Sequence, residues 1–409
     1  MIHFIHTADI HFGVENYGKI DQKTGFHTRL LDFHSALQHC ITYAIDHKVD
    51  FFLFCGDAYK TASPTPTQQK LLLSNFLQLY QAQIPVVIIV GNHDHPLSFG
   101  KVNSLDIFSD LPIQGFHVIH KPACITIATQ NGPVQIVGIP WPTKSNYTLA
   151  NQTLTTQQIT EQLVSSVSSI INSFAQELDP TIPSVLAGHL TVSSGVFSGS
   201  EKRAIYGPDP TFLPSQLAVA PFNYVALGHL HRHQIINPGG HPPIVYAGSI
   251  ERLDFGERRE EKGFCEVFIE KHETKVDFIT LKTRQFIQLD IVFEDSTVKQ
   301  TEYIISKIKE QNVENAIIKI SYQLKPGQKD LVDLKEIQQA CSEAHYVAGI
   351  HAVRPVEQRE RRSNQVKLDM SIEPLLQEYF KQKAIAPEKA KQLIDKIMQL
   401  KQETEIGNN

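Results

Sequence analysis

The chain has 409 residues, of which 41% are hydrophobic and 20% are charged, and this is the composition of a globular protein. Its net charge of −5 argues against a protein that merely coats nucleic acid, because such proteins are usually basic. A chain of this length exceeds what one hydrophobic core usually spans, so two or three domains are expected.

The five cysteines are scattered and form no C-x-x-C pair. This argues against a disulfide framework or a thiolate zinc site and fits a reducing cytoplasm. The first residues lack a basic segment followed by a long apolar stretch, and no run approaches the roughly 20 apolar residues that span a bilayer. We therefore expect a cytoplasmic protein without a membrane segment.

The first two-thirds of the chain alternates short apolar runs with amphipathic stretches. The runs predict strands at Ile2–His6, Phe51–Cys55, Pro85–Val90, Val134–Ile139, Ser184–Ala187, Tyr224–Leu227, Ile244–Ala247, Gly263–Ile269 and Lys275–Leu281. Helices are predicted at His27–His47 and Gln68–Gln81, because their apolar residues recur on one face. A polar, exposed loop is expected at Asn146–Thr156. The alternation predicts a layered α/β fold with a largely buried sheet.

A different pattern begins at Arg284. It predicts a small β-α-β-α-β domain with elements at Phe286–Phe293, Thr301–Gln311, Ala316–Tyr322, Asp330–Glu343 and Tyr346–Val353. The charged segment Arg354–Lys367 is typical of a linker, and two short helices are expected after it, at Ser371–Lys381 and Pro387–Lys401. The predicted domains are residues 1–283, residues 284–355, and residues 356–409 with the linker and the helical pair.

Five polar motifs follow predicted strands. They are Asp9-Ile10-His11, Gly56-Asp57, Gly91-Asn92-His93-Asp94, Gly188-His189 and Gly228-His229-Leu230-His231. In open α/β folds, sites form at the carboxyl ends of strands. Carboxylate, imidazole and amide ligands suit divalent ions such as Mn²⁺, Fe²⁺ or Zn²⁺. The ordered set of five motifs therefore predicts a metal site.

The geometry expected of these motifs is simple. In an extended chain, alternate side chains share a face, so Asp9 and His11 would point the same way, as would His229 and His231. Glycine before the other ligands would let the backbone turn sharply. Asp57 is placed to bridge two ions, which together can support a phosphoryl displacement.

Each motif also has a plainer interpretation. Asp-x-His is common, Gly-Asp often marks a turn after a strand, and a buried histidine such as His189 is often only a hydrogen-bonded core residue. Gly-Asn-His-Asp is much more specific, and the metal interpretation depends on the whole set.

The same motifs resemble those of the calcineurin-like metallophosphoesterases. The resemblance implies a double β-sheet sandwich flanked by helices, here with a small α+β capping domain and a C-terminal helical pair. It implies that Asp9, His11, Asp57 and His231 hold one ion, and that Asp57, Asn92, His189 and His229 hold the other. It also implies that His93 acts at the scissile phosphate and that Asp94 orients His93 through its second ring nitrogen.

Other segments resemble the SbcD branch of bacterial nucleases. They are His6–Gly13, Gly248–Glu257 and Arg284–Phe286. This resemblance implies a metal-dependent DNA exonuclease and endonuclease of a repair or recombination complex, with Mn²⁺ as the expected ion. It also implies that the terminal helices dock onto an SbcC-type ATPase and that the chain forms a homodimer through the helices at His27–His47 and Gln68–Gln81.

Three basic residues near the motifs are candidate DNA contacts: Lys60, Arg252 and Arg258. Arginine and lysine supply most phosphate contacts in nonspecific DNA binding. Lys60 stands where archaeal relatives have histidine. The alternative for Lys60 is an exposed loop lysine, and Arg252 and Arg258 lie among acidic residues that would suit a solvated face. For the terminal helices, the alternative is packing within their own domain.

Two other functions compete with the nuclease. A phosphoesterase for nucleotides or other small phosphodiesters would keep the same ligands but would not need the domain after Arg284. A non-catalytic scaffold that tethers DNA ends would be expected to lose ligands, whereas all of them are present here.

Overall fold

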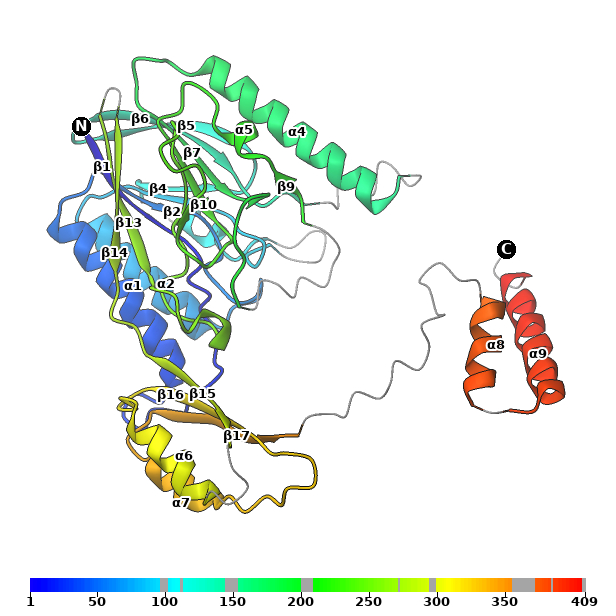
Figure 1. The fold of residues 1–409 in the computed structure, drawn as a ribbon. Coiled ribbons are helices and arrows are strands. Elements are labelled where there is room, and N and C mark those ends of the chain that lie inside the picture. The colour runs from blue at the N-terminus through cyan, green and yellow to red at the C-terminus, as the bar shows by residue number, and fades with distance from the viewer. Residues whose placement is uncertain are drawn as a thin grey trace. The chain divides into compact units, whose positions relative to one another are not determined.

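The computed structural model describes residues 1–95, 102–110, 113–143, 154–199, 209–270, 273–293, 299–354, 372–383 and 385–406. The chain divides into two compact units. The first comprises Met1–Tyr322 with Leu331–His351, and the second comprises Gln323–Asp330 with Ala352–Asn409. Figure 1 shows the elements of both units.

Two six-stranded sheets form the centre of the first unit. The first sheet has the order β14 (Thr274–Thr280), β13 (Gly263–Ile269), β1 (Ile2–Thr7), β2 (Phe51–Phe54), β3 (Val86–Ile89) and β4 (Phe116–Ile119). The second has the order β11 (Gln234–Ile235), β12 (Ile244–Tyr246), β10 (Tyr224–Gly228), β7 (Ser184–His189), β6 (Gly132–Ile139) and β5 (Ala123–Thr129). The short strands β8 (Thr191–Val192) and β9 (Thr211–Phe212) pair beside them.

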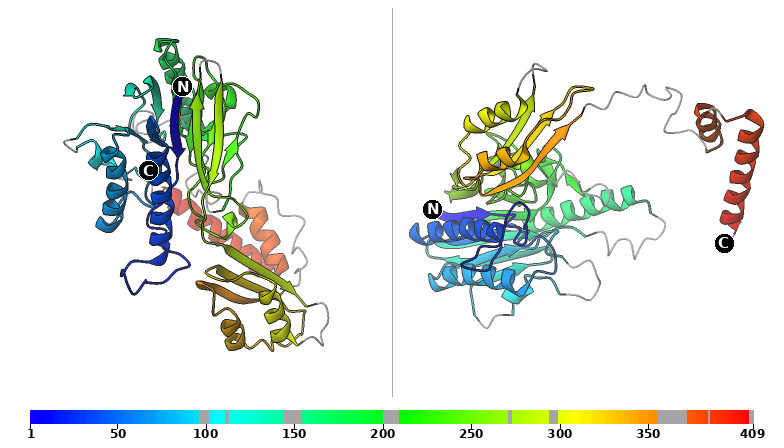
Figure 2. Two further views of the ribbon diagram at one scale, coloured as in Figure 1. Left: turned by 90° about the vertical axis from the view of Figure 1, so that its left-hand side faces the viewer. Right: turned by 90° about the horizontal axis from the view of Figure 1, so that it is seen from below.

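Helices cover the outer faces of both sheets (Figures 1 and 2). The helices α1 (Thr28–Asp46) and α2 (Pro66–Gln81) pack on the first sheet, where Phe33 and Phe76 lie in one buried cluster with Phe52. The helix α4 (Thr156–Glu177) packs on the second sheet, with Val167 and Ile171 buried. The fold is thus a two-sheet α/β sandwich flanked by helices, and the predicted fold class is confirmed.

A third apolar cluster joins the two sheets. Alternate residues of each strand face this inner layer, as the period of an extended chain requires. Phe4 and Leu53 of the first sheet lie in it together with Val185 and Ala226 of the second. Because β1, β2 and β3 are parallel to one another, as are β6, β7, β10 and β12, each sheet brings the carboxyl ends of several strands to one edge.

The structure has a helix and edge strands that the sequence pattern did not predict. The helix α4 begins at Thr156, where the predicted loop Asn146–Thr156 ends, and residues 146–153 of that loop lie outside the described residues. Many of its residues are Ser, Thr or Gln, which weakens a helical pattern, but Ile159, Leu163, Val167 and Ile171 recur every fourth residue and are buried. The edge strands β4 and β5 were also missed, since edge positions carry fewer buried residues.

A smaller sheet lies beyond β14. Its order is β15 (Phe286–Val292), β16 (Ile317–Gln323) and β17 (Tyr346–Val353), with α6 (Gln300–Lys309) and α7 (Leu334–Ala340) between successive strands in the chain. Ile304 and Ile308 of α6 are buried, as are Ile317, Ile318 and Ile320 of β16. The predicted β-α-β-α-β order is confirmed.

The second unit ends in two helices, α8 (Ile372–Gln382) and α9 (Pro387–Ile406), which contact each other. Phe380 and Ile394 are buried, whereas Tyr379 and Leu393 are exposed. Most of the predicted linker Arg354–Lys367 lies outside the described residues. Among the helices of the described ranges, none has both the length and the apolar character that a membrane crossing requires.

A buried histidine connects the two sheets. The Nδ1 atom of His6 in β1 lies 3.0 Å from the hydroxyl oxygen of Tyr224 in β10. Burial lowers the pKa of His6 from its ordinary 6.5 to about 3. The folded protein therefore holds this side chain neutral at pH values where the unfolded chain would protonate it.

We predict that His6 contributes to acid sensitivity. Between pH 6.5 and 3 the unfolded state binds the extra proton, so a fall in pH favours unfolding. The free energy of unfolding should fall between pH 7 and 5 by about 2 kcal/mol more in the wild type than in His6→Gln. Urea unfolding at both pH values measures this difference, and equal losses would contradict it.

Candidate metal centre

The predicted ligands meet at one end of the sandwich. Each of the five motifs lies at the carboxyl end of a strand that pairs in parallel with a neighbouring strand. These strands are β1, β2, β3, β7 and β10. The loops after β1 and β2 run together, since the backbone N–H of Asp9 donates to Gly56 at 2.9 Å and that of His11 donates to Asp57 at 3.0 Å. The backbone N–H of His229 donates to the carboxylate of Asp9 at 3.0 Å, which joins the two sheets.

Four of the predicted ligands have left-handed backbone conformations. The φ angles are 54° at Asp9, 51° at His11, 60° at Asp57 and 100° at His229. The expectation that Asp9-x-His11 and His229-x-His231 are extended is therefore wrong, because the chain turns at these ligands. Such conformations cost about 1–3 kcal/mol each for residues with a side chain and are concentrated at functional sites.

Glycines allow the loops to approach one another closely. A Cβ at Gly91 would collide with the backbone and carboxylate of Asp57, and a Cβ at Gly228 would collide with the carbonyl oxygen of Cys55. Gly56 does adopt a left-handed φ of 90°, as the turning role predicted. At Gly91 and Gly228, glycine is needed because a Cβ would not fit, and not because of an unusual backbone conformation.

Asp9, His11 and His231 form one ligand group, with ligand atoms within 4.8 Å of one another. The Nε2 atoms of His11 and His231 lie 3.0 Å apart. The Nδ1 atom of His231 lies 2.8 Å from Glu257 Oε1, and a carboxylate can only accept there, so neutral His231 presents the Nε2 lone pair to the site. This arrangement suits a cation.

A second group lies beside the first and shares Asp57. The Oδ2 atom of Asp57 lies 3.6 Å from His11 Nε2 and 3.3 Å from His189 Nε2. The Oδ1 atom of Asn92 lies 3.0 Å from His189 Nε2 and 3.2 Å from His229 Nδ1. One carboxylate oxygen of Asp57 is thus adjacent to ligands of both groups.

These residues fit divalent ions. Asp9, Asp57 and His189 are at most 1% exposed, and the ion pairs of Asp57 among the described residues are with histidines. His189 Nδ1 lies 2.7 Å from the carbonyl oxygen of Cys55, which can only accept, so Nε2 is the nitrogen that faces Asp57 and Asn92. Burial lowers the pKa of His189, but Asp57 outweighs burial and raises it to about 9, so an ion would take the place of the Nε2 proton. Nitrogen and oxygen ligands without sulfur suit first-row divalent ions.

The charges of the ion-free centre follow from burial and proximity. Burial raises the pKa of Asp9 to about 6. Burial acts in the same direction on Asp57, but His189 and His93 outweigh it and hold the pKa of Asp57 well below its ordinary value. Burial holds the pKa of His11 well below its ordinary value, so this ring is neutral and can coordinate.

His93 lies at the open side of the centre. Its side chain is exposed, its ring centroid lies 4.9 Å from that of His11, and its backbone N–H donates to Asp57 Oδ1 at 2.9 Å. The Nδ1 atom lies 2.7 Å from the carbonyl oxygen of Lys60 and must donate to it. The second nitrogen, Nε2, remains for a ligand.

The expected pairing of Asp94 with His93 is wrong. The Asp94 carboxylate is buried and accepts the backbone N–H groups of Gly91 at 3.0 Å, Asp57 at 2.9 Å and Ala58 at 3.0 Å. Burial, together with the neighbouring Asp57, raises the pKa of Asp94 to about 7. Asp94 therefore ties the β2 and β3 loops together, and the carbonyl of Lys60 orients His93.

The three candidate DNA-binding residues have different surroundings. Lys60 is exposed, and its backbone carbonyl contacts His93 Nδ1. Arg258 is partly buried and donates to the carbonyl of Phe255 at 2.9 Å. Arg252 is only 6% exposed and donates to Thr283 Oγ1 at 2.6 Å, so the expectation that it contacts DNA needs correction.

Three residues at the centre were missed as participants. Glu257 is fully buried against His231, although its sequence position gave no sign of this contact. The ring of Trp141 lies 4.8 Å from that of His229. The carboxylate of Asp209 lies 3.6 Å from His229 Nε2. Each of these contacts joins segments that are far apart in the sequence. The only sequence signal that could have led to these three residues is the set of predicted ligands that they contact.

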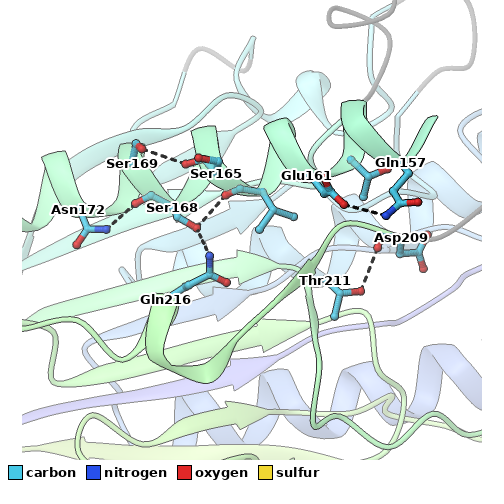
Figure 3. Close-up of a pocket in the computed structure, with 11 residues that line it drawn as sticks. Gln157, Glu161, Ser165, Ser168, Ser169, Asn172, Asp209, Thr211 and Gln216 are labelled. Atoms are coloured by element: carbon cyan, nitrogen blue, oxygen red, sulfur yellow. Dashed lines mark hydrogen bonds between the residues drawn. The ribbon is translucent and has the colours of Figure 1, made fainter. Parts of the chain in front are cut away.

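An open groove of about 640 Å³ runs along α4 to Asp209 (Figure 3). Several of its polar side chains are already hydrogen-bonded: Asn172 donates to the carbonyl oxygen of Ser168, and Gln216 donates to the Ser168 hydroxyl. The groove holds none of the predicted ligands, and it reaches the metal centre at Asp209.

The family comparison agrees with this location. A family model for calcineurin-like phosphoesterases matches residues 2–233, a range that contains all of the predicted ligands. Two solved structures are similar over 68% of this chain and 98% of theirs, each at 10% identity: TT1561 of Thermus thermophilus, with a TM-score of 0.39, and a dimetal phosphatase from Danio rerio, with a TM-score of 0.38.

We predict that Asp57→Asn severely weakens ion binding. The substitution removes the charge that both ligand groups share, so affinity should fall by more than the roughly 10- to 100-fold typical of a residue that only supports a ligand. Titration of Mn²⁺ into the ion-free protein by calorimetry measures the change. Asp179→Asn, in an exposed turn that bonds Thr181, is the matched control and should bind normally. Unchanged binding by Asp57→Asn would contradict the bridging role.

Proposed function

The chain belongs to the calcineurin-like phosphoesterase family, and from this premise we propose that it is the nuclease subunit of an SbcCD-type complex. In this proposal it hydrolyses phosphodiester bonds at DNA ends and hairpins, as an exonuclease and endonuclease of repair or recombination. The position of Asp57 Oδ2 between His11 and His189 is the observation that carries the two-ion part of the proposal.

The ligands divide into two sets that share Asp57. Asp9, His11 and His231 would hold one ion with it, and Asn92, His189 and His229 would hold the other. Two divalent ions, proposed to be Mn²⁺, would lower the pKa of water and neutralise charge on the phosphate. The buried, preorganised donors require little rearrangement to bind them.

His93 is proposed to act on the phosphate itself. Its Nδ1 proton is held by the Lys60 carbonyl, and its backbone is fixed by Asp57 Oδ1. In the protonated ring Nε2 carries the second proton, which can stabilise the charged phosphate or pass to the leaving oxygen. The exposure of His93 leaves room for a large substrate on this side.

The choice of DNA is supported by features outside the centre. The small sheet β15–β17 and the helices α8 and α9 are additions that a phosphoesterase for small phosphodiesters would not need. The exposed Lys60, whose backbone carbonyl contacts His93, is a proposed phosphate contact. Arg258 is a weaker candidate because its guanidinium already bonds Phe255.

The proposed partners bind helices that contribute no predicted ligand. Tyr379 of α8 and Leu393 of α9 remain exposed in the helical pair, and such apolar side chains suit docking onto an SbcC-type ATPase. The helices α1 and α2 are the proposed homodimer surface. They contact each other through Gln38 and Gln78, and Tyr80 at the end of α2 is 40% exposed.

We predict Mn²⁺-dependent digestion of linear duplex DNA by the purified protein together with an SbcC-type ATPase. Asn92→Ala should abolish digestion by removing a ligand, whereas His93→Ala should reduce it by about 10²- to 10⁴-fold and still bind the ions. Gel analysis of digestion, with calorimetry of Mn²⁺ binding, separates the two effects. His120→Ala, whose side chain is 49% exposed, is the matched control.

Two other results would redirect the proposal. Hydrolysis of bis-p-nitrophenyl phosphate without any DNA digestion, even with the ATPase present, would leave a phosphoesterase of small phosphodiesters and refute the nuclease. DNA tethering without hydrolysis of either substrate, and without bound ions, would leave a non-catalytic scaffold.

A further inference from the structure

A buried charged pair lies directly behind His231. Glu257 is 0% exposed and Lys262 is 1% exposed, although charged side chains are seldom fully buried. The Oε1 atom of Glu257 lies 2.8 Å from His231 Nδ1, and its Oε2 atom lies 2.9 Å from Lys262 Nζ. Lys262 Nζ also donates to the carbonyl oxygen of His231 at 3.0 Å. Both members of the pair thus contact the same predicted ligand.

We propose that Glu257 is a positioning residue for His231, an inference that rests on the proposed metal centre. Glu257 Oε1 fixes the proton on His231 Nδ1, which leaves Nε2 to coordinate. Glu257 Oε2 accepts from Lys262 and from the backbone N–H of Leu253 at 3.0 Å, so the carboxylate itself cannot rotate freely. The ring of His231 is therefore fixed in orientation and in tautomer before an ion binds.

Stability alone does not account for the pair. Removing two charges from water costs several kcal/mol per ion, and apolar residues of similar size often replace such a pair without loss of stability. Lys262 also has another carboxylate, Glu260 Oε2, at 3.0 Å. The contact that only Glu257 can make is the one to His231 Nδ1, and this contact points to the metal centre.

The loop that carries Glu257, residues 252–262, is also bonded to the rest of the chain through Arg252. Arg252 donates to Thr283 Oγ1 at 2.6 Å, to the carbonyl of Arg284 at 3.1 Å and to the carbonyl of Glu260 at 2.7 Å. Arg284, just before β15, forms two hydrogen bonds with the carboxylate of Asp32 in α1, at 2.6 and 2.8 Å. The bonds of Arg252 thus connect two positions of this loop to each other and to Thr283 and Arg284, and this network supports the placement of Glu257.

The experiment compares Glu257→Gln with Glu260→Gln by calorimetric titration of Mn²⁺ into the ion-free proteins. Both substitutions remove one carboxylate charge from Lys262, but only the first alters the partner of His231. The wild type should bind two ions. Glu257→Gln should bind one of them about 10- to 100-fold more weakly and the other normally, and Glu260→Gln should match the wild type.

A double variant separates positioning from stability. Glu257→Leu/Lys262→Met replaces the pair with apolar side chains and removes the unpaired charge. Its thermal unfolding should resemble that of the wild type, because no charge is left buried without a partner, while its affinity for one ion stays low. Wild-type affinity for both ions in Glu257→Gln or in the double variant would overturn the inference. Absence of any ion from the wild type would instead overturn the proposed metal centre.

Discussion

The carboxylate of Asp57 is the interaction on which the rest of the centre depends. One of its oxygens lies near imidazole nitrogens from the ends of β1 and β7, which belong to different sheets. A buried carboxylate without a cationic partner is costly, so the fold must supply imidazoles or bound cations around it. The parallel strands satisfy this requirement by bringing their carboxyl ends to one place. The parallel arrangement of the strands therefore also determines which side chains gather at the site.

The loops that carry the ligands are fixed by contacts that contribute no ligand. Asp94 accepts hydrogen bonds from backbone N–H groups of the loops after β2 and β3. At Gly91 and Gly228 the neighbouring loops lie so close that no Cβ would fit. These contacts offset the strain of left-handed conformations at Asp9, His11 and Asp57. Glu257 and Lys262 complete the framework behind His231. The centre is thus held in place from several sides, as preorganised binding requires.

The sequence was sufficient to predict the strands that carry the motifs, because buried strands have continuous apolar runs and each motif stands at a strand end. It also predicted the β-α-β-α-β order of the small sheet and its two helices. It failed for α4, whose Ser- and Thr-rich sequence hides a buried face, and for the backbone of Asp9 and His11, where tertiary contacts impose left-handed conformations. The partners of Asp94 and Glu257 were not predictable either, because those contacts exist only after the loops come together.

The most direct test of a shared two-ion centre is an anomalous difference map from crystals grown with Mn²⁺. A shared centre predicts two peaks, one contacted by Asp9, His11 and His231 and the other by Asn92, His189 and His229, with Asp57 in contact with both. A single peak, or two peaks of which only one contacts Asp57, would contradict it.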